Sequence, residues 1–325
     1  MNIYDIAKRC EVSIATVSRV LNGSDKVRPA TRDKILAVMK ESNYSPSSMA
    51  RGLGTGYTRM VGLLWDADID NHYAAAIAPI EQALQAQGMS VLLRTTSPTE
   101  DKQKALDDLA QQGVDGILVM GVTLTEEDEA ALYTAAQRAP LMVIGANVNV
   151  PGVHCVHCDE QSAVAALVGD LFLRQRRNIL LLHNGDTLAN RDKIAGYRDG
   201  YAVGGYPVDE ARIISVPPQL DAINTCIKQL LMQRVSFDAV IGTEDMLALG
   251  AQKALQRTGL SMPVIGCNNS LLARCVTPEL SSIDNHLLQL CDTAVDLLCH
   301  RLQGEEIPPY TAIPATLAER DTFRR

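Results

Sequence analysis

The sequence predicts an α/β protein with a small all-α module at its N-terminus. Three observations predict this fold class. Residues 1–59 are basic and contain short amphipathic helical patterns, the remaining residues are acidic, and from residue 59 onward short apolar strands alternate with helical stretches. Such alternation is typical of parallel sheets covered by helices on both faces. A chain of 325 residues has room for about two or three domains.

The first two predicted helices are short and are separated by the segment "EVS" at residues 11–13. Apolar side chains recur at helical spacing in each of them: Ile3, Ile6, Ala7 and Cys10 in the first, and Val17, Val20 and Leu21 in the second. Ser13 is a favourable N-cap for the second helix, and Asn22-Gly23 supplies its stop. These two pieces are too small to bury a core alone, so a third element must pack against them.

Pro29 suits the first turn of a third helix, whose residues Ile35, Val38 and Met39 would face inward. Three short helices with a tight turn between the first two form a helix-turn-helix module. Amphipathic patterns alone equally allow a plain three-helix cap without a binding role.

The outer face of the second helix carries small, polar and basic side chains: Ile14, Ala15, Ser18, Arg19 and Asn22. Such side chains can approach base edges closely, with Arg19 as a long donor suited to guanine. Residues 1–59 contain ten Lys and Arg against five Asp and Glu, a net charge of +5, which leaves −13 for the remainder of a chain whose total is −8. A basic module on an acidic body is the distribution that a polyanion-binding module would show.

Residues 46–58, "PSSMARGLGTGYT", have the composition of a linker. Their glycines suggest a phosphate loop, but the sequence predicts no strand before them and no helix directly after them, so this signal is weak.

From residue 59 the strands and helices alternate in two sets. The first set has strands at 59–65, 90–95, 116–120 and 141–146, with helices at 74–87, 100–112 and 126–138. The second has strands at 178–185, 211–216, 237–243 and 262–266, with helices at 160–175, 191–203, 220–234 and 245–257. Two doubly wound lobes are therefore expected, with a ligand cleft between them at the carboxyl ends of the strands.

The N-terminal motifs "IYDIAKRCEVSIATVSRVLNG", "VRPATRDKILAVMKESNYSP" and "SSMARGL" closely resemble the DNA-binding headpiece and hinge of the LacI/GalR family of bacterial transcriptional repressors. The resemblance implies that Thr16 and Ser18 hold the second helix against phosphates, and that Ile14, Ala15 and Arg19 read bases in the major groove. Asn22, at the end of the same face, is expected to contact DNA as well.

The resemblance also implies a short hinge helix in the linker, ordered on DNA, with one hinge per subunit in the minor groove at the operator centre. Leu53 matches the wedging leucine of the family, and Ala50 and Arg51 match the "AR" before it. A leucine side chain inserted between base steps unstacks them and bends the duplex.

The segments "RDKIAGYRDGY", "FDAVIGTEDMLALGAQKAL" and "VIGCNNSLLARCVTPELSSID" resemble the periplasmic-binding-protein-like core of the same family. The expected domains are a headpiece at 1–45, a hinge and linker at 46–58, and an effector-binding core at 59–325. Within that core the first lobe is expected at about 59–158 plus 285–313, and the second at about 159–284 plus 314–325.

The expected effector pocket departs from the family pattern. Lys193 stands where the family commonly has an Arg, with Arg191 two residues earlier. Glu244 replaces an Asn, and Asn268 replaces an Asp, so the net charge of these positions is unchanged. A neutral sugar or polyol is therefore the expected effector, whereas Glu244 counts against a phosphate. The alternative is that Glu244 points out of the cleft or pairs with Lys193.

Trp65, the only tryptophan, ends the first strand of the first lobe, where it is either part of the core or a platform for a sugar ring. The segment "HCVHC" at 154–158 has metal-like composition, but His154 and His157 would point to opposite faces of a strand, as would Cys155 and Cys158. We therefore expect neither a metal site nor a cofactor there.

The sequence also limits the function classes. It contains no Ser elbow, Walker loop or dinucleotide fingerprint after a strand, so no enzyme is expected. A DNA-binding repressor and a sugar-uptake protein share the predicted core, and the headpiece together with the charged N-terminus favours a cytoplasmic repressor over an exported protein. Eight scattered cysteines indicate reduced thiols.

The expected assembly is a homodimer on a near-palindromic operator, because the sequence stops after its predicted last strand, without an added heptad helix. The second candidate within the family is the catabolite control regulator, which uses a phosphorylated carrier protein as corepressor. Asp296 stands where that regulator has an Arg, and an acidic group there would repel a phosphoserine.

Overall fold

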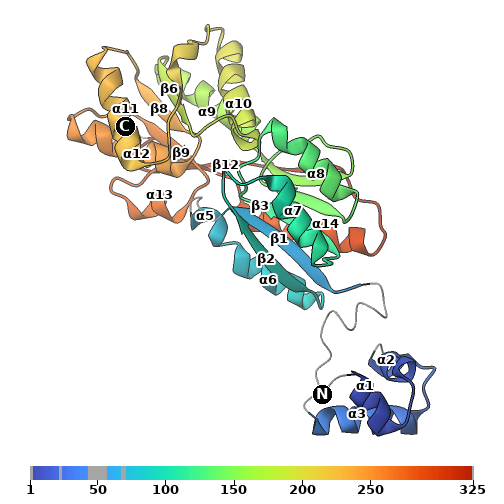
Figure 1. Ribbon diagram of the computed structural model, residues 1–325. Helices are drawn as coiled ribbons and strands as arrows, with labels where there is room; N and C mark the ends of the chain where they lie inside the picture. Colours follow the sequence, from blue (N-terminus) through green and yellow to red (C-terminus); the bar gives the residue numbers. More distant parts are fainter. Residues whose placement is uncertain (1–2, 22–23, 43–56, 67–70, 324–325) are drawn as a thin grey trace.

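The computed structural model describes residues 3–21, 24–42, 57–66 and 71–323. The chain forms an N-terminal module of three helices, followed by two sheet-containing lobes (Figure 1). The module consists of α1 (Ile3–Cys10), α2 (Ile14–Leu21) and α3 (Pro29–Glu41). Its core contains the apolar residues expected from the helical spacing: Ile6, Ala7, Cys10, Val17, Val20, Ile35 and Met39 are buried, and Ile3, Leu21 and Val38 pack at its edge.

The first lobe is built on a six-stranded parallel sheet of order β11-β5-β4-β3-β1-β2. Its strands are β1 (Met60–Asp66), β2 (Ser90–Thr96), β3 (Gly116–Met120), β4 (Leu141–Ile144), β5 (Val153–Asp159) and β11 (Tyr310–Pro314). One face is covered by α6 (Ile77–Ala86) and α14 (Leu287–Leu302). The other face is covered by α7 (Lys102–Gln111) and α8 (Glu129–Ala136). Two short elements, α5 (Asn71–Ala74) and η1 (Glu126–Asp128), complete the lobe.

The second lobe repeats this plan with a sheet of order β12-β10-β9-β8-β6-β7. Its strands are β6 (Ile179–His183), β7 (Ile213–Ser215), β8 (Ala239–Gly242), β9 (Val264–Cys267), β10 (Ser281–Asp284) and β12 (Thr316–Ala318). The helices α9 (Glu160–Leu173) and α10 (Leu188–Gly204) pack on one face, and α11 (Leu220–Met232) and α12 (Asp245–Arg257) pack on the other. Two short helices, η2 (Glu210–Arg212) and α13 (Leu271–Cys275), lie in connecting segments.

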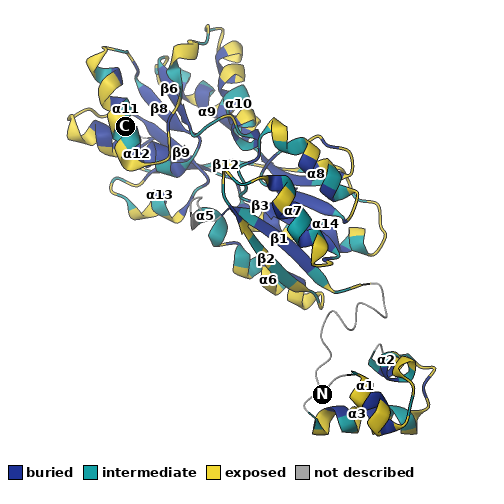
Figure 2. Cartoon of the chain, in the orientation of Figure 1, coloured by how far each residue is buried: buried dark blue, intermediate teal, exposed yellow. Residues whose placement is uncertain are grey.

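The chain passes between the two sheets three times: after β5, after β10, and between β11 and β12. Burial follows the layered plan in Figure 2, where the inner strands of each sheet are dark and the outer faces of the helices are exposed. None of the described helices is both long enough and apolar enough to cross a membrane.

Two details differ from the sequence-based expectation. The helix expected over 74–87 begins later, as α6 at Ile77, and the short helix α5 precedes it. Pro79 therefore lies in the first turn of α6, where a missing N–H has no cost. The second sheet is not wholly parallel, because β12 pairs antiparallel with β10. An antiparallel edge strand on a mostly parallel sheet is common in such folds.

Gly196 determines how closely α10 approaches α9. A Cβ at this position would lie 2.2 Å from the carbonyl oxygen of Gln161. Only glycine therefore permits this contact between the helices, and the contact brings the side chains at the start of α9 against those at the start of α10.

Candidate functional site

The outward face of α2 combines small and basic side chains. Ile14, Ala15 and Arg19 are exposed, and Ile14 retains 42% of its accessible surface. Ser13 caps the helix as expected, since the Thr16 amide donates to Ser13 Oγ at 3.2 Å and the two hydroxyls lie 2.9 Å apart. The hydroxyl of Thr16 is thus held at the N-terminus of α2, where a helix favours an anion.

Of the remaining residues expected to contact DNA, the structure describes only one. Ser18 is half-buried beside the exposed face of α2. Asn22, Ala50, Arg51 and Leu53 lie outside the described residues.

A cavity of about 1160 Å³ lies between the two lobes. Much of its polar lining follows parallel strands, where both sheets present their carboxyl ends: Thr123 after β3, Asn184 after β6, Glu244 after β8, Asn268 after β9, and Asp284 at the end of β10. This is the position at which doubly wound sheets bind ligands.

Glu244 is held in place by a chain of amides. Asn184 Nδ2 donates to Glu244 Oε1 at 2.8 Å, and Asn190 Nδ2 donates to Asn184 Oδ1 at 2.6 Å. The neighbouring Asp245 has a different role, because it is fully buried and accepts from the Ser270 amide and from Ser282 Oγ, both at 2.6 Å. Glu244 therefore faces the cavity, whereas Asp245 ties α12 to β10 and to the N-terminus of α13.

Asn268 lies at the floor of the cavity and is 4% exposed. Asn285 Nδ2 donates to Asn268 Oδ1 at 3.2 Å, and Asn285 Oδ1 lies 3.2 Å from Nε2 of His72 in α5. Asn268 has a φ of +99°, a backbone region that asparagine tolerates better than most residues. These contacts join the second lobe to the first beneath the cavity.

Lys193 does not line this cavity. It is 5% exposed, and its Nζ lies 3.2 Å from Oε2 of Glu160, which is equally buried. Burial is the largest single effect and lowers the pKa of the Lys193 ammonium. The charge of Glu160, together with smaller effects of Cys267, Tyr73 and Glu244, acts in the other direction, and the net pKa of Lys193 is raised. Burial raises the pKa of the Glu160 carboxyl, and the nearby charge of Lys193 lowers it by less, so the net pKa is raised. Lys193 therefore pairs with Glu160 and not with Glu244.

Tyr73 of α5, in the first lobe, lies close enough to Lys193 and Glu160 to interact with their charges. Burial raises its pKa, and the charges of Lys193 and Glu160 act on its hydroxyl. Gly121 leaves room for the tyrosine, because a Cβ at this left-handed position would lie 2.6 Å from the Tyr73 ring. Trp65, also in the first lobe, packs against the core of that lobe and is absent from the cavity lining; its Nε1 is buried and has no hydrogen-bond partner among the described residues.

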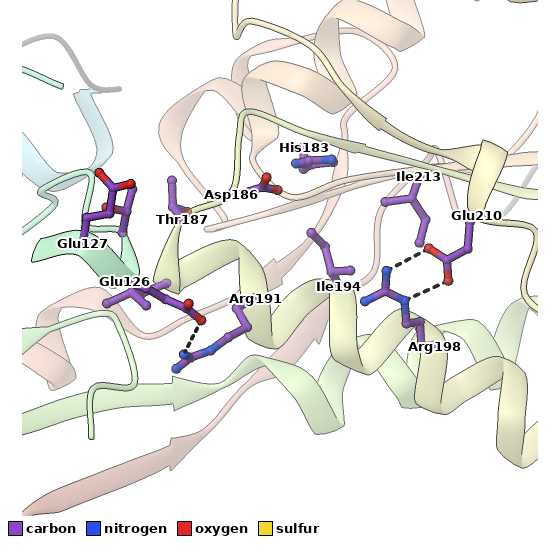
Figure 3. Close-up of a pocket in the computed structure, with 12 residues that line it drawn as sticks. Glu126, Glu127, His183, Asp186, Thr187, Arg191, Ile194, Arg198, Glu210 and Ile213 are labelled. Carbon is purple, nitrogen blue, oxygen red and sulfur yellow. Dashed lines mark hydrogen bonds and ion pairs between the residues drawn. The ribbon is translucent and has the colours of Figure 1, made fainter. Parts of the chain in front are cut away.

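Arg191 lies at a second, smaller cavity of about 760 Å³, which is lined by residues of α10 and η1 (Figure 3). Its Nη2 donates to the carbonyl oxygen of Asn147 at 3.0 Å, and its Nη1 lies 3.9 Å from Glu126. One turn earlier, Leu188 is buried in the core of the first lobe and its amide donates to the Leu124 carbonyl at 2.8 Å. We call these contacts of Leu188 and Arg191 the latch, because they join the second lobe to the first beside the cavity.

The segment at 154–158 forms most of β5. Cys155 packs on one face of the first sheet and Cys158 on the other, as strand geometry requires. Within the ranges that the structure describes, no group of three or more His, Cys, Asp and Glu side chains has a metal-binding arrangement.

Comparison with known proteins decides the family. Residues 2–47 match the family model described as "Bacterial regulatory proteins, lacI family", and residues 58–311 match "Periplasmic binding proteins and sugar binding domain of LacI family". The chain belongs to the LacI family. This membership confirms the resemblance seen in the N-terminal motifs and the predicted α/β fold class.

Individual LacI-family relatives cover nearly the whole chain. It is 37% identical over 330 residues, 99% of both chains, to an HTH-type transcriptional regulator of Lachnoclostridium phytofermentans. It is 29% identical to catabolite control protein A of Staphylococcus xylosus, over 100% of this chain and 99% of that protein. A structure of the Lac repressor dimer bound to operator and an anti-inducer matches with a TM-score of 0.85 at 23% identity, covering 99% and 98% of the two chains.

Sequence reasoning missed several residues of this LacI-family core. Asn184 directly follows an apolar strand, so the rule that located Glu244 and Asn268 would have located it as well. Glu160, Tyr73 and His72 carried no such signal, because their roles arise from contacts between segments far apart in the sequence.

Proposed function

We propose that this LacI-family regulator is a transcriptional repressor that binds a near-palindromic operator as a homodimer and responds to a sugar-like effector in the inter-lobe cavity. The exposed face of α2 carries the proposal for DNA, because it places Ile14, Ala15 and Arg19 outward on a helix whose N-terminus is capped and whose module is basic. Asn22 and the hinge residues Ala50, Arg51 and Leu53 are proposed to complete the interface.

The inter-lobe cavity supports the effector proposal. Amides and carboxylates from several strand ends converge there, and Glu244 and Asn268 are proposed to hydrogen-bond the effector. Hydroxyl groups both donate and accept, which suits a lining of amides and carboxylates. Lys193, Arg191 and Trp65 are proposed to support the site from outside the cavity. A solved relative of similar fold is described as a regulator–cellobiose complex.

The dimer proposal rests on the free edge of the first sheet. β2 is the terminal strand of that sheet, and Leu93 on it is 44% exposed. Sheet edges of this kind are normally covered, and a second copy of the chain is the proposed cover. The regulator is proposed to act in the cytoplasm, without catalytic activity and without a cofactor.

The DNA-binding proposal is tested by selecting operator sequences from a random library with the full chain and then measuring affinities by mobility shift. Arg19→Ala should lose about 1–3 kcal/mol on the selected operator, as expected for a bidentate base contact, and less on random DNA. Lys40→Ala, which changes an exposed cation on α3, is the matched control. Equal losses for Arg19→Ala on both DNAs would make Arg19 a phosphate contact, and selection of no sequence would refute the proposal.

Control by a phosphorylated carrier protein is a second candidate function. The 29% and 28% identities to catabolite control proteins A favour it. Asp296 counts against it, because this carboxylate stands on α14 with 65% of its side chain exposed, where it would meet a phosphoserine. A rise in operator affinity on addition of a serine-phosphorylated carrier protein, absent with the unphosphorylated form, would favour this second candidate.

A further inference from the structure

We propose that the smaller cavity beside the latch is a second ligand site, which binds an organic amine with an ammonium group on a short apolar body. Its volume of about 760 Å³ lies within the range of pockets for small ligands, roughly 300–1,000 Å³. The described residues of this lining and of the larger cavity do not overlap. The inference therefore does not depend on which effector the larger cavity takes.

The lining of the smaller cavity is acidic. Its charged side chains are four carboxylates and two guanidinium groups: Glu126, Glu127, Asp186, Glu210, Arg191 and Arg198. Arg198 is neutralised by Glu210, with donor–acceptor distances of 3.0 and 2.8 Å, and Arg191 is engaged in the latch (Figure 3). Glu127 and Asp186 form no hydrogen bond or ion pair with any residue that the structure describes. Their negative charges therefore remain to attract a cation.

These two carboxylates come from different lobes. Glu127 stands in η1 of the first lobe, and Asp186 follows β6 of the second. Both are exposed residues of the cavity lining. An ammonium group has three N–H donors, so one ligand can bind carboxylates of both lobes. Hydrogen bonds of this charged kind are roughly twice as strong as neutral ones.

His183 adds a buried polar group to the same lining. It is 6% exposed. Its Nδ1 lies 3.2 Å from the carbonyl oxygen of Gly185 and 3.3 Å from the Gly185 amide nitrogen, whereas Nε2 has no partner among the described residues. When the Nδ1 proton is donated to that carbonyl, Nε2 is an acceptor. A ligand N–H group would satisfy this acceptor, which is costly to leave unpaired in a buried position.

Apolar side chains complete the cavity. Arg191, Ile194 and Arg198 lie on successive turns of one face of α10, and Ile213 of β7 lines the same cavity. Both isoleucines are half-buried. An apolar body attached to the ammonium would remove them from water, which a bare ion would not do. The part of the chain that the structure describes also holds no metal-binding cluster, so an organic cation fits better than a metal ion.

The site is connected to the latch and to the larger cavity. Two latch residues line it. The Gly185 carbonyl that contacts His183 also accepts from Asn190 Nδ2 at 2.9 Å. The same Nδ2 donates to Asn184, which in turn donates to Glu244 in the larger cavity. An amine bound here would favour the arrangement of the lobes that the latch holds.

The test is calorimetry of the full chain at pH 7 and constant ionic strength, with matched probes. They are 2-phenylethylamine, the neutral 2-phenylethanol, the anionic 3-phenylpropanoate, methylamine and magnesium chloride. Of these, 2-phenylethylamine alone combines an ammonium with an apolar body. It should bind about tenfold more tightly than the alcohol or methylamine, and 3-phenylpropanoate should give no binding heat.

Variants then locate the amine. Glu127→Gln and Asp186→Asn each remove one charge at an exposed position, so the fold should be retained. Each should weaken 2-phenylethylamine binding about fivefold, through loss of a charged hydrogen bond, while leaving the affinity for the alcohol within about twofold. Glu306→Gln is the control, because it makes the same change of charge at an exposed position outside this lining. It should change neither affinity.

Four results would overturn the proposal. The first is the absence of amine binding, or equal affinities for the amine and the alcohol. The second is tighter binding of magnesium than of the amine. The third is an equal loss in Glu127→Gln and Glu306→Gln, which would indicate general attraction to an acidic chain. The fourth is a loss in Glu244→Gln without one in Glu127→Gln, which would place the amine in the larger cavity.

Discussion

Lys193→Ala should destabilise the second lobe strongly. Lys193 and Glu160 are about equally buried, their charged atoms lie 3.2 Å apart, and Glu160 Oε1 has no hydrogen-bond partner in the described part of the chain. Removing the ammonium leaves a buried carboxylate without its cation, which typically costs about 3–5 kcal/mol. The free energy of unfolding should therefore fall by roughly 3 kcal/mol or more at pH 7.

The pH dependence of this loss follows from the carboxyl group. Burial raises the pKa of Glu160, and the raising should be larger in Lys193→Ala because the opposing cation is gone. A protonated Glu160 needs no cation. The loss should be smallest below the unfolded carboxyl pKa and should reach its full size as the pH rises through the raised folded pKa.

The measurement is urea denaturation of the full chain, followed by circular dichroism because Trp65 reports only on the first lobe. Lys193→Met with Glu160→Gln keeps the volume and removes both charges, so the double variant should be within about 1.5 kcal/mol of the unaltered protein. Lys228→Ala, at an exposed position of α11, is the control and should have little effect. A loss below about 1 kcal/mol for Lys193→Ala would refute the assigned role of the pair.

Two further predictions concern the latch and the thiols. Arg191→Ala should weaken effector binding about fivefold, or about 1 kcal/mol, because it removes a contact between the lobes. The control is Arg198→Ala, which removes an ion pair with Glu210 inside the second lobe and should leave the affinity for the same effector unchanged. Equal losses of effector affinity in the two variants would refute the role of the latch. Among the eight free cysteines only Cys275 is exposed, whereas burial raises the pKa of the Cys158 thiol to about 12. A thiol reagent at pH 8 should therefore modify one cysteine rapidly, and Cys275→Ser should abolish that phase; several rapid thiols would contradict the described packing.

Much of the fold could be predicted from the sequence because the burial of apolar side chains determines both the order of apolar residues along the chain and how the strands and helices pack. Parallel strands buried on both faces are continuous apolar runs, so β3 and α12 have the bounds that their patterns predict. The same rule located Glu244 and Asn268, because residues that follow parallel strands meet at one edge of a sheet. The antiparallel direction of β12 could not be predicted, since a three-residue strand carries no signal of its direction.

The roles of Arg191 and Lys193 could be predicted only in part. Both were expected at the effector pocket, but residues two apart on a helix do not share a face, a rule that this expectation did not apply. Which of them faces the cleft depends on how α10 packs. The partner of Lys193 could not be inferred, because Glu160 approaches it only through the close contact of α9 and α10 at Gly196.

The three chain crossings between the lobes also order the events of synthesis. The first sheet is incomplete until β11 (310–314) has emerged from the ribosome, and the second until β12 and Phe323, which is buried in its core. The N-terminal module has its own core by Met39. Because domains form as units during translation, the N-terminal module proposed to bind DNA can fold long before the two lobes proposed to control it. A chain whose synthesis stops early would therefore contain a folded N-terminal module without complete lobes.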